Sequence, residues 1–185
     1  MSSSAENEKK LVEKVTEEYW RKMEKINNDF QTTIKEVQAW QKETFGDKLT
    51  LKGILLKLHE EFEEHQEVQE ALEEKFKNTS ELDINIPENR ELYQRWYEEL
   101  ADFVMVALEF ELIGSKFGKF LVSRIQMPPL VLESVTEAMK KKLEKNKKRK
   151  TWVFNDDGVS KHIEETTDLA SASEGNSRVQ EADKN

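Results

Sequence analysis

Long stretches without glycine or proline constrain this chain more than any other feature of its sequence. The 185 residues include six glycines and three prolines, and apolar residues recur at every third or fourth position over long stretches. That spacing places the apolar side chains on one face of a helix, and the scarcity of chain-breaking residues favours long helices over strands. We therefore predict an all-α protein with a four-helix-bundle-like core.

Residues that begin and end helices divide the chain into four main helices and one short helix. Gly46 is expected to end the first helix, Thr50 to cap the start of the second, and Pro87 to open the third. The predicted helices span about 8–43 (with a break near Asn27 and Asn28), 50–76, 87–113 and 130–146, with the short helix at 116–125. The polar stretch 78–85 is predicted to be a loop.

Composition sets the expected domain organisation and location. The net charge is −9, cysteine is absent, and no apolar run approaches the roughly 20 residues that a membrane span requires. A disulfide framework and cysteine-ligated zinc are therefore excluded, and nucleic acid is not an expected partner of so acidic a chain. We expect a soluble, cytoplasmic protein with one domain at 9–163 and a disordered segment at 1–8. The tail at 164–185 is also expected to be disordered, because it has too few apolar residues to offset the entropy of ordering.

Two pairs of carboxylates are the strongest candidates for chemistry: Glu61 with Glu64, and Glu99 with Asp102. Within each pair the residues are three positions apart, so on a helix they share one face. Four carboxylates that converge between packed helices would form an oxygen-rich site for a hard divalent cation such as Mg²⁺. The alternative for any glutamate-rich helix is a solvated acidic face.

Helical phase distinguishes the carboxylates of the second helix. Glu60, Glu63 and Glu67 fall opposite the apolar stripe of this helix and are predicted to be solvated. Glu61 falls at the edge of the stripe and Glu64 just beyond it. These two positions can face a neighbouring helix while still touching solvent.

In the third helix, periodicity gives a less clear answer about which carboxylates are exposed. Glu99 lies at the edge of its apolar stripe, whereas periodicity alone leaves Asp102 exposed. The segment that follows, FVMVALEF, is apolar on nearly every side and should be buried, and this helix is the candidate for the element that a partner subunit covers. A carboxylate where a buried stretch begins needs a partner or a metal ion. Glu109 and Glu111 interrupt this segment; they could face a subunit contact, pair with a lysine, or lie at the end of the bundle.

The segment at 140–150, KKKLEKNKKRK, is strongly basic, although the chain as a whole is acidic. Three interpretations stay open: charge that complements the C-terminus of a helix, a patch for nucleic acid or membrane, or recognition of phosphate.

Six segments in a fixed order resemble the MazG-like, all-α nucleoside triphosphate pyrophosphohydrolases. They are WQKETFG at 40–46, GIL at 53–55, EFEE at 61–64, ELAD at 99–102, KLEKNKKRKTW at 142–152, and DG at 157–158 with His162 after it. The resemblance is to the MazZ-type branch of dATP/dGTP diphosphohydrolases, several of them encoded by bacteriophages, and it covers about 37–162. Lys57 departs from the pattern, since the family often has histidine there.

The resemblance implies a Mg²⁺-dependent hydrolase, with Mn²⁺ as a possible substitute. Such an enzyme splits a (d)NTP, here expected to be a purine dNTP such as dGTP or dATP, into (d)NMP and pyrophosphate. It implies that Glu61, Glu64, Glu99 and Asp102 are the catalytic and metal-binding residues. It also implies a MazG fold, a homodimer or homotetramer, and action in the host cytoplasm if the gene is from a phage.

By the same resemblance, Lys142, Asn146 and Arg149 would contact the triphosphate, and Trp40 and Trp152 are candidates for stacking on the base. The alternative function is a non-catalytic helical protein that senses nucleotides, or that binds a partner through the basic segment.

Overall fold

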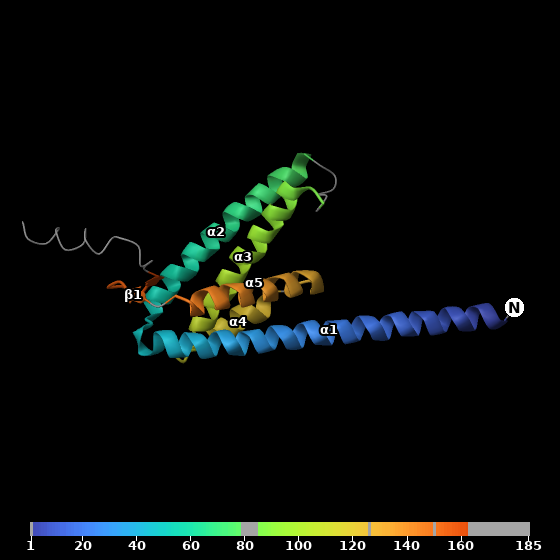
Figure 1. The fold of residues 1–185 in the computed structure, drawn as a ribbon, viewed down its shortest axis with the longest axis horizontal. Helices are drawn as coiled ribbons and strands as arrows, with labels where there is room; N and C mark the ends of the chain where they lie inside the picture. Colours follow the sequence, from blue (N-terminus) through green and yellow to red (C-terminus); the bar gives the residue numbers. More distant parts are fainter. Residues whose placement is uncertain (1, 79–84, 126, 150, 163–185) are drawn as a thin grey trace, which may run out of the picture.

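The computed structural model describes residues 2–78, 85–125, 127–149 and 151–162 (Figure 1). Its helices are α1 (Ser2–Phe45), the short 3₁₀ helix η1 (Gly46–Lys48), α2 (Leu51–Asn78), α3 (Pro87–Glu109), α4 (Phe117–Arg124) and α5 (Pro129–Lys147). Strands β1 (Trp152–Phe154) and β2 (Ser160–His162) form an antiparallel hairpin. The prediction of an all-α protein is confirmed, whereas the tail predicted at 164–185 and most of the predicted loop at 78–85 lie outside the described residues.

Helix α3 is the centre of the arrangement, since it packs against α1, α2, α4 and α5. In Figure 1, α2 and α3 form a pair that leans away from α1, while α5 runs alongside α1. One apolar core lies between α1, α3 and α5 and includes Val37, Val104 and Met139. A second core, around Phe45 and Phe110, joins the end of α1 to the start of α2 and the end of α3.

Helix α1 is longer and more regular than the sequence predicted. It begins at Ser2, whereas the sequence analysis expected residues 1–8 to be disordered. The ion pair between Lys10 and Glu6, at 3.0 Å and one turn apart, supports this first part of the helix. The predicted break at Asn27 and Asn28 is wrong. Burial of Ile26 and Phe30 on either side of the asparagines holds the helix straight through them.

The apolar stretch of α3 is buried within a single chain. Val104, Ala107 and Leu108 have almost no exposed surface. Helix α4 approaches so closely that a Cβ atom at Gly118 would collide with the backbone oxygen of Ala107. The expectation that a partner subunit covers this stretch is therefore not needed to explain its composition. The helix ends at Glu109, four residues earlier than predicted.

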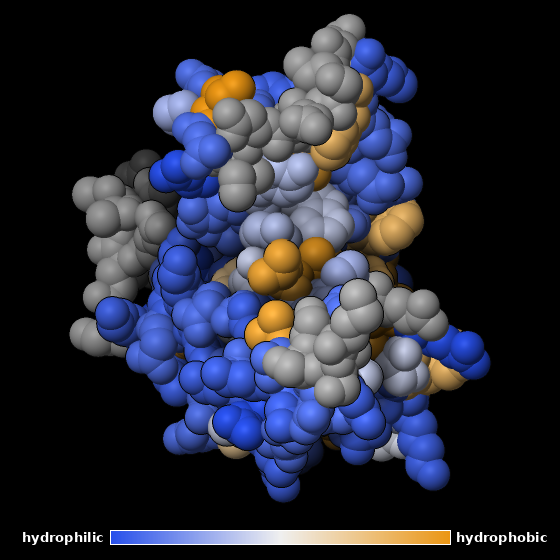
Figure 2. Space-filling model, turned by 90° about the vertical axis from the view of Figure 1, so that its right-hand side faces the viewer, coloured by the Kyte–Doolittle hydropathy of each residue, from blue (hydrophilic) through white to orange (hydrophobic). Residues whose placement is uncertain are grey.

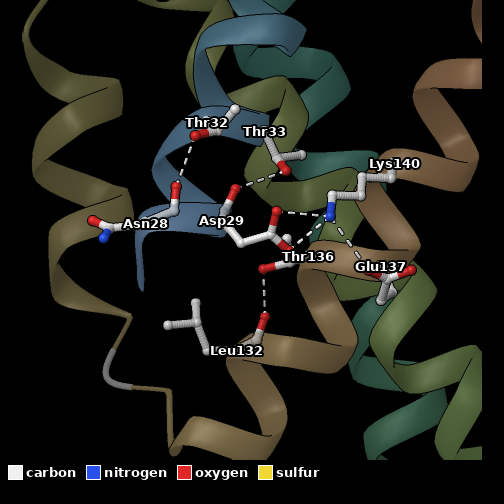
Figure 3. A network of polar contacts seen from close by, with 8 residues as sticks. All are labelled: Asn28, Asp29, Thr32, Thr33, Leu132, Thr136, Glu137 and Lys140. Carbon is white, nitrogen blue, oxygen red and sulfur yellow. Dashed lines mark hydrogen bonds and ion pairs between the residues drawn. The ribbon is translucent and has the colours of Figure 1, made fainter. Parts of the chain in front are cut away.

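A polar network joins α1 to α5 (Figure 3). The ammonium of Lys140 donates to both carboxylate oxygens of Asp29, at 2.7 and 2.8 Å. Nearby, the buried hydroxyls of Thr33 and Thr136 donate to carbonyls one turn earlier in their own helices, at 2.9 and 2.6 Å. The threonines thus satisfy their own polar groups, and Lys140 with Asp29 makes the link between the helices.

Replacing Asp29 with asparagine should lower the free energy of unfolding by less than about 1 kcal/mol. The side chains of Lys140 and Asp29 are 36% and 45% exposed, so solvent screens their attraction. Chemical denaturation compares the variant with Asp47→Asn, an exposed aspartate in η1. A loss above about 2 kcal/mol would contradict this prediction, because exposed ion pairs contribute less stability than that.

Hydrophobic surface gathers in a hollow on the face seen from the right-hand side of Figure 1 (Figure 2). The groove there, between α3 and the first half of α5, encloses about 870 Å³ and is lined in part by Tyr93, Tyr97, Leu130 and Val131. Among the described helices, none is both long enough and apolar enough to cross a membrane.

Candidate functional site

A pocket of about 420 Å³ lies where α1, α2, α3, α5 and the hairpin meet. Its walls bring together eight of the nine residues that the sequence analysis selected for the site. They are Trp40, Glu61, Glu64, Asp102, Lys142, Asn146, Arg149 and Trp152. The ninth, Glu99, lies beside the pocket in the carboxylate cluster described next.

Three carboxylates from α2 and α3 form a tight cluster. One oxygen atom from each of Glu61, Glu99 and Asp102 lies within 4.8 Å of the others. Glu61 is only 5% exposed, Asp102 is buried, and Glu99 is half-buried. Because α2 and α3 pack along each other, the two predicted pairs face one another, and three of the four selected carboxylates converge.

Glu64, the fourth selected carboxylate, lines the pocket but is exposed and lies outside the cluster. Its pKa is raised by partial loss of solvent and then by the negative charges of Glu61 and Glu99. Glu60, Glu63 and Glu67 are exposed, as helical phase predicted.

Burial also raises the pKa values of two acids on α3. It raises the pKa of Asp102 to about 6, against the opposing attraction of Lys142 and with added repulsion from Glu61 and Glu99. The pKa of Glu99 is raised by burial too, with Lys142 again opposing and Glu61 adding repulsion. Acids that are buried close together hold protons more strongly than acids in water.

Glu109 also lines the pocket, although the sequence analysis did not place it there. It is 6% exposed, and burial raises its pKa to about 8, with Lys57 opposing the shift and Glu61 adding to it. A spacing of seven residues from Asp102, which is two helical turns, is the signal that could have found it. Glu111 instead pairs with Lys119 at 2.9 Å, which is one of the alternatives left open.

Two lysines contact the carboxylate cluster. The ammonium of Lys142, from α5, donates to Asp102. The ammonium of Lys57, from α2, lies 2.8 Å from Glu61 and donates to Glu60 at 2.8 Å. Burial alone would lower the pKa of Lys57, but its hydrogen bonds to the two glutamates outweigh burial and raise it. The sequence analysis noted Lys57 only as a departure from the family pattern.

Arg149, two residues after the end of α5, lines the pocket. Its guanidinium donates to the amide oxygen of Asn146 at 2.8 Å and lies 5.7 Å from the ring centre of Trp152. Trp152 in turn packs edge to face against Trp40 and Phe45, with ring centres 5.8 and 5.2 Å apart. The two tryptophans therefore form one aromatic wall.

Three buried polar atoms in this pocket have no hydrogen-bond partner among the described residues: Gln41 Oε1, Glu61 Oε2 and Trp152 Nε1. The other end of the Gln41 amide donates to the backbone oxygen of Met105 at 2.7 Å, which fixes its orientation. Unpartnered buried polar atoms are rare in folded proteins, and a group of them in one pocket indicates a place for a polar ligand.

The hairpin, which the sequence analysis did not predict, closes the pocket. Its loop rests on the start of α2, where a Cβ atom at Gly53 would collide with the backbone oxygen of Gly158. Thr50 accepts a hydrogen bond from the Gly53 amide at 2.9 Å, as a helix cap does, and donates to the backbone oxygen of Asp157 at 2.7 Å. Two motifs that the sequence separates by about a hundred residues are thus in direct contact.

Replacing Gly53 with alanine should displace the hairpin loop and lower the free energy of unfolding by about 1–3 kcal/mol. The added methyl group would lie 2.3 Å from the backbone oxygen of Gly158, so the loop backbone must shift to make room. Chemical denaturation measures the loss. Lys35→Ala, on the exposed surface of α1, is the control and should stay within about 0.5 kcal/mol of the wild type. An unchanged free energy of unfolding for Gly53→Ala would show that the loop is not held by its contact with α2.

The pocket thus has both carboxylate oxygens and cationic donors among the side chains that line it. Carboxylates suit a hard divalent cation, and lysine and arginine suit phosphate groups. In comparisons with known proteins, no protein family, no curated protein and no solved structure matches the chain.

Proposed function

We propose that the protein is a Mg²⁺-dependent nucleoside triphosphate pyrophosphohydrolase of the MazG-like type, which releases pyrophosphate from a purine dNTP such as dGTP or dATP. One observation carries this proposal. Two members of the carboxylate cluster, Glu61 and Asp102, line the same pocket as Lys142, Asn146 and Arg149, whose side chains suit phosphate groups. The choice of a purine deoxynucleotide rests on the resemblance of the sequence motifs.

The carboxylate cluster fits Mg²⁺ by its chemistry. Its ligand atoms are all carboxylate oxygens, and Oε2 of the buried Glu61 has no partner among the described residues. Glu61, Glu99 and Asp102 would hold the ion, and Mn²⁺ could replace it. When bound, the ion would neutralise phosphate charge and lower the pKa of a bound water molecule.

The remaining side chains have distinct roles in the proposal. Arg149 presents a planar fork suited to phosphate oxygens, and Asn146 holds that fork in orientation. Lys142 adds a mobile positive charge next to Asp102. Glu64 would accept a proton from the attacking water, since it lines the pocket outside the cluster and partial burial raises its pKa above the ordinary value.

The aromatic wall of Trp40 and Trp152 would contact the base. Tryptophan faces offer large apolar area for stacking, and the unpartnered Trp152 Nε1 offers a hydrogen-bond donor. The unpartnered oxygen of Gln41 offers a fixed acceptor. Both are suited to the polar edge of a nucleobase.

Incubation with each of the four deoxynucleoside and four ribonucleoside triphosphates, followed by a pyrophosphate assay, tests the proposal. We expect release from at least one purine dNTP with Mg²⁺ and none after chelation with EDTA. No release from any of the eight nucleotides would overturn the proposal.

A nucleotide sensor that binds in the same pocket without turnover is the second candidate. Tight binding by calorimetry with negligible release of pyrophosphate would favour it. The basic segment gives less support to a nucleic-acid patch, because Lys140, Lys142 and Lys147 all pair with carboxylates of the same chain. The proposal also includes assembly into a homodimer or homotetramer, which sedimentation equilibrium measures directly.

A further inference from the structure

We propose that Lys57 and Lys142 are built-in counter-ions of the carboxylate cluster. They leave their carboxylates when a divalent cation enters and then contact the phosphates of the substrate. This inference rests on the proposed function, because it assumes that the cluster binds a metal ion. It adds a residue, Lys57, to the site, and it predicts that metal and phosphate strengthen each other's binding.

Lys57 contacts the cluster from one helical turn before Glu61. Its ammonium lies 2.8 Å from Oε1 of Glu61 and also donates to Oε2 of the exposed Glu60 at 2.8 Å. The side chain of Lys57 is 28% exposed and lines the pocket. Lysine one turn before glutamate is the less stabilising order of such a pair in a helix. Stabilisation of α2 is therefore a poor explanation for this contact, and neutralisation of a buried acid is a better one.

Lys142 reaches the same cluster from a different helix. It comes from α5 and contacts Oδ2 of Asp102, while Lys57 comes from α2 and contacts Glu61. Two of the three cluster carboxylates therefore already have a positive partner. Only one oxygen of Glu61 is occupied, however, since Oε2 remains without a partner among the described residues. The cluster is neutralised in part and still open at one buried oxygen.

A divalent cation among these carboxylates would be repelled by both ammonium groups. Lysine side chains are flexible, so the ammonium groups can move a few ångströms away along the pocket wall. Phosphate groups that enter next would give the displaced lysines new negative partners. The cation and the phosphate should then bind cooperatively, and each should bind weakly alone.

The variant Lys57→Met removes one counter-ion and nearly keeps the volume of the side chain. Without nucleotide at pH 8, it should bind Mn²⁺ on the order of tenfold more tightly than the wild type, because one repelling charge is gone. With saturating Mg²⁺, it should bind inorganic pyrophosphate on the order of tenfold more weakly. Electron paramagnetic resonance of free Mn²⁺ and calorimetry measure the two affinities.

Lys77→Met is the matched control. It removes the same charge from the same helix, 20 residues or about 30 Å away, and both affinities should stay at wild-type values. A lysine with only a structural role would lower Mn²⁺ affinity when replaced, or leave it unchanged. If Lys57→Met does not fold, as judged by circular dichroism, Lys57→Gln is measured in its place with the same expectation.

Unchanged or weaker Mn²⁺ binding by the folded Lys57 variant would overturn the counter-ion inference. If the wild type still released pyrophosphate, the proposed function would stand. A wild-type protein that neither binds Mn²⁺ nor releases pyrophosphate would overturn both.

Discussion

The variant Glu61→Gln is expected to lose at least about a thousandfold in kcat for the proposed release of pyrophosphate. Glu61 is the most deeply buried member of the carboxylate cluster, and its Oε2 atom has no partner among the described residues. Glutamine keeps the shape of the side chain and removes the charge that would hold the metal ion. Loss of metal-based charge stabilisation costs several kcal/mol, and about 1.4 kcal/mol corresponds to each tenfold change in rate.

Glu63→Gln is the control for this variant. Glu63 lies on the same helix, its side chain is 63% exposed, and it contacts His59 at 3.4 Å. Its replacement should leave kcat within about twofold, as expected for a surface change. Thermal unfolding checks that both variants fold. A folded Glu61→Gln protein that kept a tenth or more of the activity would show that the cluster is not the catalytic centre.

The variant Glu109→Gln is expected to change how stability depends on pH. Burial raises the pKa of Glu109 in the folded protein to about 8, from 4.5 as the ordinary value. Between these values the folded state binds a proton that the unfolded state has released. The contribution of Glu109 to the free energy of unfolding is therefore fully present below pH 4.5 and is lost as the pH rises through 8.

The difference between variant and wild type gives the size of this effect. Relative to the wild type, Glu109→Gln should gain stability from pH 5 to pH 9, by roughly 4 kcal/mol. Chemical denaturation at pH 5, 7 and 9 with EDTA present measures the gain without interference from metal ions. Glu98→Gln, an exposed change on the same helix, should follow the wild type. Parallel curves for Glu109→Gln and the wild type would contradict the prediction.

Local signals predicted most of the helical framework. Gly46, which has a φ of 51°, follows the last residue of α1, and Pro87 is the first residue of α3. Thr50 caps α2 through the Gly53 amide, as its position before an apolar stripe indicated. Helical phase also selected Glu61 and Glu99 correctly for the cluster. These features depend on residues within one or two turns, which a sequence displays directly.

Features that depend on distant contacts were missed. The hairpin strands have three residues each, too short for a pattern, and the hairpin loop is placed by its contact with Gly53. Glu109 looked like an interruption in an apolar helix, because its role depends on a pocket built from other elements. Asn27 and Asn28 suggested a break, yet burial of their neighbours Ile26 and Phe30 outweighs the modest helix propensity of asparagine.

The contact between the hairpin and the start of α2 bears on the order in which the site is completed during synthesis. All members of the carboxylate cluster lie on α2 and α3, neighbours in sequence that can pair as soon as both have left the ribosome. The residues of α5 that we propose contact phosphate, and the hairpin, leave it later. A nascent chain therefore carries its acidic cluster before it carries the residues that close the pocket. Of the two lysines that contact the cluster, Lys57 and Lys142, Lys57 is the one already present at that stage.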